Sequence, residues 1–121
     1  MHMNIVIESR ALSAASGGVK TYTYELIKNI LALHPEASYE LLYGSQKPVG
    51  IFPHVQETVI PLRSDLLLSY WMSIQVARHV RAAKPSVVHF TKAALPYKKS
   101  VPTVVTLYDI IPILFPGTQS P

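Results

Sequence analysis

Residues 3–33 read MNIVIESRALSAASGGVKTYTYELIKNILAL and contain three patterns in succession. The first six residues form a short run rich in Ile and Val, which is typical of a strand buried on both faces. The loop that follows ends in a pair of glycines. Beyond the glycines, apolar residues recur every three or four positions, which predicts an amphipathic helix that ends before Pro35. Together these patterns predict the first half of a βαβ unit.

The predicted helix carries an apolar stripe, which we expect to pack against the sheet. The members of this stripe are Val19, Tyr22, Leu26, Ile30 and Leu33. Most charged side chains of the segment fall outside it. The helix is therefore predicted to cover one face of a sheet.

Gly17 and Gly18 stand where the first helical turn begins. The leading amides of a helix lack internal partners and lie at the positive end of its dipole, so they attract an anion such as phosphate. Glycine lets the anion approach the backbone because it has no Cβ. The alternative is that the pair only permits a tight entry into the helix, and the spacing differs from the GxGxxG dinucleotide fingerprint. Gly17, Gly18 and the adjoining Val19 are candidate phosphate contacts.

The rest of the chain predicts four more strands and a second helix. The strands are expected at residues 39–43, 57–60, 87–90 and 103–107. The helix is expected from residue 66 to about residue 83, after Ser64 as its N-cap. Its predicted apolar stripe is Leu67, Tyr70, Ile74, Ala77 and Val80, with Trp71 beside it.

Apolar strands that alternate with helices predict an α/β fold. We expect one Rossmann-like domain over residues 1–121, with a mainly parallel sheet and helices on both faces. Ligands of such sheets bind beyond the carboxyl ends of the strands. The loops that leave those ends are therefore where a functional site is expected.

Composition excludes several classes of protein. The chain has 121 residues and no cysteine, so it has no disulfide framework and no thiolate metal site. We find no pattern of a signal peptide and no apolar run of membrane-spanning length, which favours the cytoplasm. The basic residues are not interleaved with stacking aromatics, which disfavours nucleic acid as a partner.

Charge is distributed unevenly between the two halves of the chain. Residues 63–121 carry seven basic and two acidic side chains, which favours anionic partners such as phosphates, a nucleotide or acidic lipid headgroups. Arg78, Arg81 and Lys84 crowd the end of the second predicted helix, where cations complement the helix dipole. The more specific alternative is that these cations contact the inner face of a membrane.

Three segments together carry a family resemblance: Gly17-Gly18-Val19, Val87-Val88-His89, and VVTLYDIIP at residues 104–112. In their order and spacing they resemble the N-terminal domain of family 4 glycosyltransferases, and the resemblance covers nearly the whole chain. It implies the GT-B fold, in which two Rossmann-like domains face each other across a cleft. The N-terminal domain mainly binds the acceptor, and the donor-binding domain would lie outside these 121 residues.

The resemblance implies a donor-phosphate contact and a catalytic pair. Gly17, Gly18 and Val19 would contact the diphosphate of the nucleotide-sugar donor. Tyr108 and Asp109 stand where many members have a His-Asp pair near the transferred sugar. A phenol is a poorer base than imidazole at neutral pH, and turn capping is the alternative role for Asp109.

The resemblance also implies that Arg10, His89 and Lys92 contact substrate. Packing within its strand is the alternative for His89, and solvation is the alternative for Lys92. No metal ligands are implied. No cofactor is implied either, because the nucleotide sugar is a co-substrate.

The resulting expectation is the acceptor-side domain of a retaining glycosyltransferase, which moves a sugar from a nucleotide-diphosphate sugar to a hydroxyl of a saccharide or lipid-linked acceptor. We expect little transfer by this chain alone, and whether it is itself an enzyme is left open. The alternative is a non-catalytic α/β module that binds a phosphate or nucleotide, or regulates a partner. The apolar residues 110–115 are expected to pack on a donor-binding domain or on a second copy of the chain.

Overall fold

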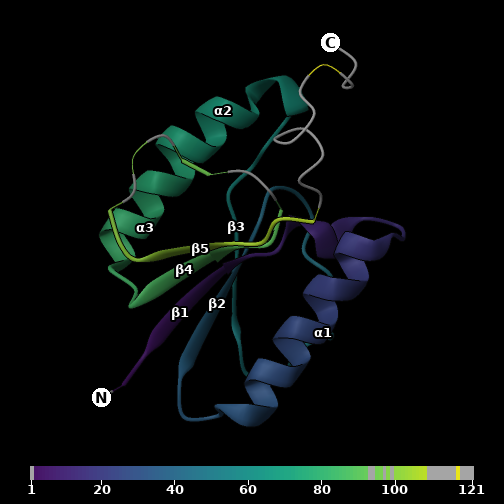
Figure 1. Ribbon diagram of the computed structural model, residues 1–121, viewed down its shortest axis with the longest axis vertical. Helices are drawn as coiled ribbons and strands as arrows, with labels where there is room; N and C mark the ends of the chain where they lie inside the picture. The colour runs from purple at the N-terminus through teal and green to yellow at the C-terminus, as the bar shows by residue number, and fades with distance from the viewer. Residues whose placement is uncertain (1, 93–94, 97, 99, 109–116, 118–121) are drawn as a thin grey trace.

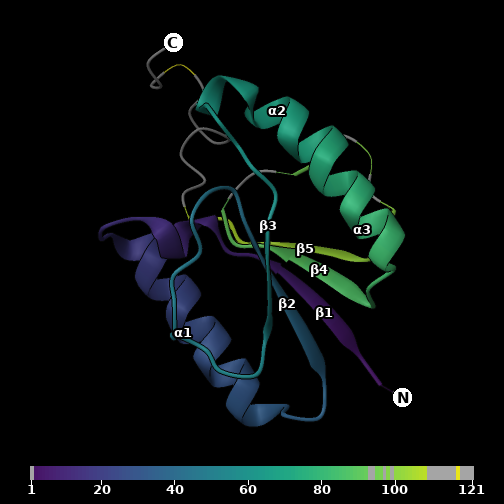
Figure 2. The ribbon, with the colours of Figure 1, turned by 180° about the vertical axis from the view of Figure 1, so that it is seen from behind.

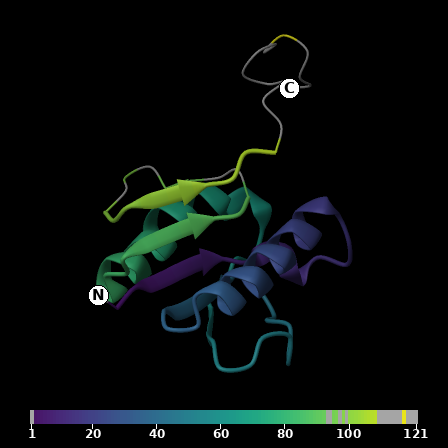
Figure 3. The same cartoon turned by 60° about the horizontal axis from the view of Figure 1, so that its bottom comes forward.

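The computed structural model has a five-stranded sheet in the order β3-β2-β1-β4-β5, with every pairing parallel. It describes residues 2–92, 95–96, 98, 100–108 and 117. The strands are β1 (Asn4–Glu8), β2 (Ser38–Tyr43), β3 (Gln56–Val59), β4 (Val87–Phe90) and β5 (Thr103–Val105). The arrows of β1, β4 and β5 point the same way in Figure 3. The predicted α/β fold with a Rossmann-like parallel sheet is confirmed.

Helices cover both faces of this sheet (Figure 1). α1 (Gly18–Leu33) lies on one face, and a short 3₁₀ turn, η1 (Arg10–Ser13), precedes it. The opposite face is covered by one continuous helical run, which is also visible from behind in Figure 2. This run consists of η2 (Asp65–Leu67), α2 (Leu68–Tyr70), the π-helical stretch η3 (Trp71–Val76) and α3 (Ala77–Ala83).

The strand order contains a reversal at β1. The chain leaves β1 through α1 to reach β2 on one side, and β4 later pairs with the other side of β1. Ile5 is consequently aligned with Tyr39 of β2 and with Val87 of β4. Crevices for ligands form where the strand order reverses, beyond the carboxyl ends of the strands. The fold therefore directs attention to the loops after β1 and β4.

Two apolar clusters fill the spaces on either side of the sheet because successive strand residues point to opposite faces. The cluster beneath α1 contains Ile5, Ile7, Leu12, Ile27, Tyr39, Leu41, Tyr43 and Phe52. The cluster beneath the other helical run contains Val6, Leu42, Trp71, Met72, Val76, Val80, Val88 and Phe90. This alternation is the physical reason that a short apolar strand such as β1 serves two cores.

The predicted packing face of α1 is right at Ile30, which packs against the core, and wrong at Tyr22 and Leu33. Thr23 and Ile27 are the buried residues of α1, whereas Tyr22 is exposed and Leu33 retains 73% of its accessible surface. Thr23 tolerates burial because its hydroxyl donates to the carbonyl oxygen of Val19 at 2.7 Å. A pattern of apolar residues alone could not include a threonine in the packing face.

The predicted stripe of the second helix is right at its end and wrong at its beginning. Ala77 and Val80 are buried as expected, but Leu67, Tyr70 and Ile74 are exposed. The buried residues here are Trp71, Met72, Val76, Ala77 and Val80. Their spacing includes two steps of five residues, from 71 to 76 and from 72 to 77, which the π-helical turn brings onto one face. A search for the α-helical period of 3.6 misses this shift.

Substitution of Leu41 by alanine is expected to lower the free energy of unfolding by about 2–5 kcal/mol, because it leaves a cavity beneath α1. Leu41 has no exposed surface, whereas Leu66 is 94% exposed. Leu66→Ala makes the same chemical change and is expected to alter stability by less than about 0.5 kcal/mol. Urea denaturation followed by circular dichroism measures both. Equal losses for the two variants would contradict the core described here.

Candidate functional site

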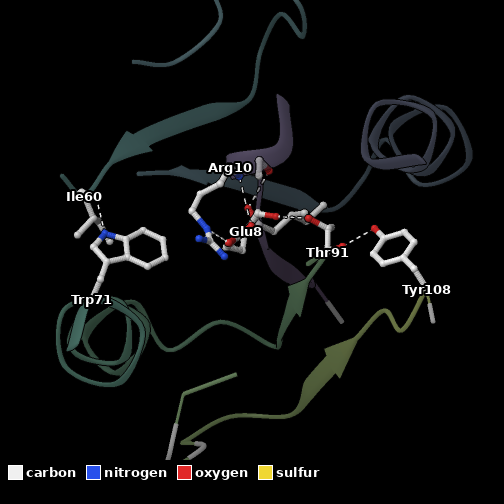
Figure 4. A network of polar contacts seen from close by, with 8 residues as sticks. Glu8, Arg10, Ile60, Trp71, Thr91 and Tyr108 are labelled. Carbon is white, nitrogen blue, oxygen red and sulfur yellow. Dashed lines mark hydrogen bonds and ion pairs between the residues drawn. The ribbon is translucent and has the colours of Figure 1, made fainter. Parts of the chain in front are cut away.

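A network of polar contacts connects the carboxyl ends of β1 and β4 with the segment after β5 (Figure 4). Glu8 is the last residue of β1, and Thr91 follows β4 directly. The Thr91 hydroxyl donates to the carbonyl oxygen of Glu8 at 2.7 Å, and the Tyr108 hydroxyl donates to the carbonyl oxygen of Thr91. The predicted catalytic Tyr108 is thus held at the point where the strand order reverses.

Glu8 and Arg10 form an ion pair inside this network. The Arg10 Nε donates to Oε1 of Glu8, and the Arg10 backbone amide donates to Oε2 at 3.2 Å. The guanidinium carbon lies 5.1 Å from the centre of the Trp71 ring, and the Trp71 indole donates to the carbonyl oxygen of Ile60 at 2.6 Å. A cation over an indole face is attracted to it. Arg10 therefore connects the end of β1 with the helical run on one face of the sheet.

Gly44 provides the room for the Arg10 side chain. A Cβ built on Gly44 would lie 3.1 Å from the Cβ of Leu62 and 3.3 Å from the Cδ of Arg10. Both distances are shorter than ordinary van der Waals contacts. The small size of Gly44, directly after β2, therefore leaves space for the side chain of Arg10.

The start of α1 is open to solvent. Gly17 is the N-cap residue, with φ of 128°, and no side chain of the described residues caps this end. A Cβ at Gly17 or Gly18 would meet nothing within 4 Å, and both residues are exposed. The Lys20 Nζ donates to the carbonyl oxygen of Ala14 at 2.6 Å, which holds a cation beside this loop. The helix start can receive an anion, with Lys20 as a cation that the sequence analysis did not single out.

His89 belongs to a chain of hydrogen bonds on the α1 side of the sheet. Its Nε2 lies 2.7 Å from the Thr106 hydroxyl, which in turn lies 3.1 Å from the Tyr22 hydroxyl. The rings of Tyr22 and Tyr108 meet edge to face, with centres 5.4 Å apart. Tyr22 and Thr106 were not predicted as site residues. Tyr22 had been assigned to the packing face of α1, and a threonine at the end of a strand gives no signal of its own.

Burial adjusts the protonation of two of these side chains. It lowers the pKa of His89, which favours the neutral imidazole. Burial is also the largest cause that raises the pKa of Tyr108, so the phenol keeps its proton at neutral pH. Both groups therefore act as neutral hydrogen-bonding partners.

A largely apolar groove of about 380 Å³ lies between the C-terminal end of α1 and the amino-end side of the sheet, and His89 is among its lining residues. Met3, Ile30, Val87 and Val104 are among the residues that line it. The groove exists because α1 covers β1 and β2 more fully than it covers β4 and β5, so Val104 keeps 48% of its surface exposed. It offers room for an apolar or flat ligand group next to an imidazole.

The predicted site residues fall into three places. Arg10 and Tyr108 join one network, Gly17, Gly18 and Val19 lie at the start of α1, and His89 lies in the groove. Lys92 is exposed just after β4. Asp109 lies outside the described residues. Within the described part of the chain, no group of three His, Asp or Glu side chains could hold a metal ion. No helix in that part is long and apolar enough to cross a membrane.

No family model, no curated protein and no solved structure matches this chain. The structure itself establishes the fold, which is a small α/β domain with a five-stranded parallel sheet. Function is therefore argued from the site.

Replacement of Arg10 by methionine is expected to lower the free energy of unfolding by about 3–5 kcal/mol, because it leaves the Glu8 carboxylate buried without its cation. The side chains of Arg10 and Glu8 are only 11% and 1% exposed. The double variant Arg10→Met/Glu8→Gln is expected to recover part of the loss, since the uncompensated charge is gone. Urea denaturation measures both variants.

The matched control is Glu36→Gln, which breaks the exposed pair of Glu36 with His34. Its unfolding midpoint is expected to stay close to that of the unchanged protein. A double variant that is less stable than Arg10→Met alone would contradict the assignment of Arg10 as the partner of a buried carboxylate.

Neutral His89 is expected to make stability depend on pH. The unfolded chain has an ordinary histidine pKa of about 6.5, so below this pH it binds a proton that the folded protein resists. Stability therefore falls as the pH is lowered through about 6.5 toward the lower pKa of the folded state. His89→Gln is expected to lose less stability than the unchanged protein between about pH 7 and about pH 5. Urea denaturation at both pH values tests this, and an equal loss in the variant would contradict it.

Proposed function

We propose that this chain is the acceptor-side domain of a retaining nucleotide-sugar-dependent glycosyltransferase. The donor diphosphate binds at the start of α1, and the acceptor binds beside His89 and Tyr108. The donor-binding carboxylates would belong to a second domain, so the chain alone binds ligands with little or no transfer. The sugar passes to a hydroxyl of a saccharide or a lipid-linked acceptor.

The observation that carries this proposal is the open, uncapped start of α1 at the carboxyl-end side of a parallel sheet, with Lys20 beside it. Gly17 and Gly18 leave the first amides accessible, and these amides and the lysine carry charge of the sign that a diphosphate requires. In such an enzyme, backbone amides and cations of this kind stabilise the departing diphosphate in the transition state. The three motif segments that resemble family 4 glycosyltransferases support the same assignment.

Tyr108 and His89 are proposed to position substrate by hydrogen bonds. Because the Tyr108 hydroxyl already donates to the carbonyl oxygen of Thr91, it is left to accept from a sugar hydroxyl, and the neutral His89 ring suits a similar contact. A retaining transfer does not require the Tyr108 phenol to act as a base, which agrees with its raised pKa.

A non-catalytic phosphate- or nucleotide-binding module is the second candidate. The Tyr108 hydroxyl favours this second candidate, because it already donates its proton to the carbonyl oxygen of Thr91 and has none left to donate to a substrate. It predicts the same contact of a phosphate with the helix start, but no preference for a nucleotide that carries a sugar.

The test is a titration of the isotopically labelled chain with UDP, GDP and their sugar conjugates, followed by amide chemical shifts. We expect shifts centred on Gly17, Gly18 and Val19 if a diphosphate binds there. Lys20→Gln is expected to weaken binding several-fold because it removes a cation from the helix start. Gly18→Ala is expected to weaken it as well, because its new methyl group meets no neighbouring atom in the fold but obstructs the anion.

Lys28→Gln is the matched control, since Lys28 is an exposed lysine farther along the same helix. Equal weakening by Lys20→Gln and Lys28→Gln would exclude the helix start as the phosphate site. Binding at the helix start that is indifferent to the sugar would favour the module over the transferase.

A further inference from the structure

An unusual set of apolar side chains is exposed on the helical run formed by η2, α2, η3 and α3. Leu66 is 94% exposed, Tyr70 55%, Leu67 49% and Ile74 42%. We call these four residues the outer stripe. Leu67, Tyr70 and Ile74 follow one another at steps of three and four residues, so they are neighbours along the run, and Leu66 adjoins Leu67 in its first turn. The run covers one face of the sheet in Figures 1 and 2, and the exposure of these four side chains shows that they lie away from the core.

The π-helical turn is the reason that the outer stripe faces solvent. Trp71, Met72 and Val76 take the buried face, and each has 2% or less of its surface exposed. Leu67, Tyr70 and Ile74 are thereby excluded from the core that their period would otherwise predict. The helical run itself is firmly packed, because the face opposite the outer stripe belongs to the buried core. Exposure of the stripe is therefore not the result of poor packing of the run.

Cations continue and flank the outer stripe. Arg78 and Arg81 follow Ile74 at steps of four and three residues, so they lie on the same exposed face, and Arg63 precedes Leu66. Asp65 is the single carboxylate between residues 61 and 84. Its position in the first turn places it at the positive end of the helix dipole. The His79 ring is directed elsewhere, toward Glu40 at 2.8 Å.

We propose that the outer stripe and its arginines form a docking surface for an anionic membrane. Apolar side chains in line with arginines suit a helix that lies in the membrane interface, with Leu and Tyr among the acyl chains and the cations at lipid phosphates. Charge complementarity selects an acidic lipid surface over a neutral one. The apolar end of the surface follows the carboxyl end of β3, and its arginines lie toward the other end of the run. This inference stands independently of the proposed transferase activity.

The experiment is sedimentation of the chain with vesicles of phosphatidylcholine alone and of phosphatidylcholine mixed with phosphatidylglycerol. We expect binding to the mixed vesicles only. The binding is expected to weaken when salt is raised from about 0.1 M to about 1 M, because the Debye length shortens from about 10 Å to about 3 Å. No nucleotide is present, so the outcome does not depend on the donor site.

Two variants and one matched control test which residues are responsible. Ile74→Ser/Leu66→Ser removes exposed apolar groups and is expected to abolish detectable binding. Arg78→Gln/Arg81→Gln is expected to weaken binding by about fivefold or more for each cation removed. Leu33→Ser changes a leucine that is 73% exposed on α1 and is expected to bind as the unchanged protein does.

Three outcomes would overturn the proposal. Equal binding to neutral and anionic vesicles would show that the arginines do not select an anionic surface. Loss of binding in Leu33→Ser as large as in Ile74→Ser/Leu66→Ser would show that general hydrophobicity is responsible. Failure to bind either vesicle, with size-exclusion chromatography showing a dimer that Ile74→Ser/Leu66→Ser dissociates, would assign the outer stripe to a second copy of the chain. Circular dichroism spectra confirm that each variant is folded.

Discussion

The buried pair of Glu8 and Arg10 is the constraint on which the rest of the site depends. A carboxylate at the carboxyl end of a central strand would be strongly unfavourable without a cation, and Arg10 supplies that cation from two residues away. The arginine also lies over Trp71, so the end of β1 is joined to the helix that covers one face of the sheet. Gly44 completes this arrangement because a larger residue would occupy the space of the arginine stem.

The same strand end also organises the other half of the site. The carbonyl oxygen of Glu8 accepts from Thr91, and the carbonyl oxygen of Thr91 accepts from Tyr108. Side-chain hydroxyls that donate to backbone carbonyl oxygens therefore connect β1 with β4, and β4 with the segment after β5. Such a network fixes the positions of Arg10 and Tyr108 relative to each other. A ligand at the reversal of strand order would meet preorganised groups.

Two different surfaces lie on opposite faces of the sheet. One contains the uncapped start of α1 and its lysine, which favour a phosphate. The other is the outer stripe with its arginines, which favours an anionic interface. If both proposals hold, the domain would bind a soluble phosphorylated donor at α1 and contact a membrane through the helical run on the other face of the sheet. A lipid-linked acceptor would be compatible with that geometry, whereas a purely soluble acceptor would not require the outer stripe.

The sequence by itself determined the five strands, the two helical regions and the parallel α/β class. Continuous apolar strands, glycine and proline positions and helix caps are local signals, so the expected strands overlap all five that are observed. The start of α1 at the glycine pair was predictable for the same reason. The tertiary structure alone decided which helix faces are buried, because a satisfied Thr23 hydroxyl and a π-helical turn change the packing without changing the apolar period. It also decided the partners of Arg10, His89 and Tyr108, since hydrogen bonds between residues distant in sequence leave no local pattern.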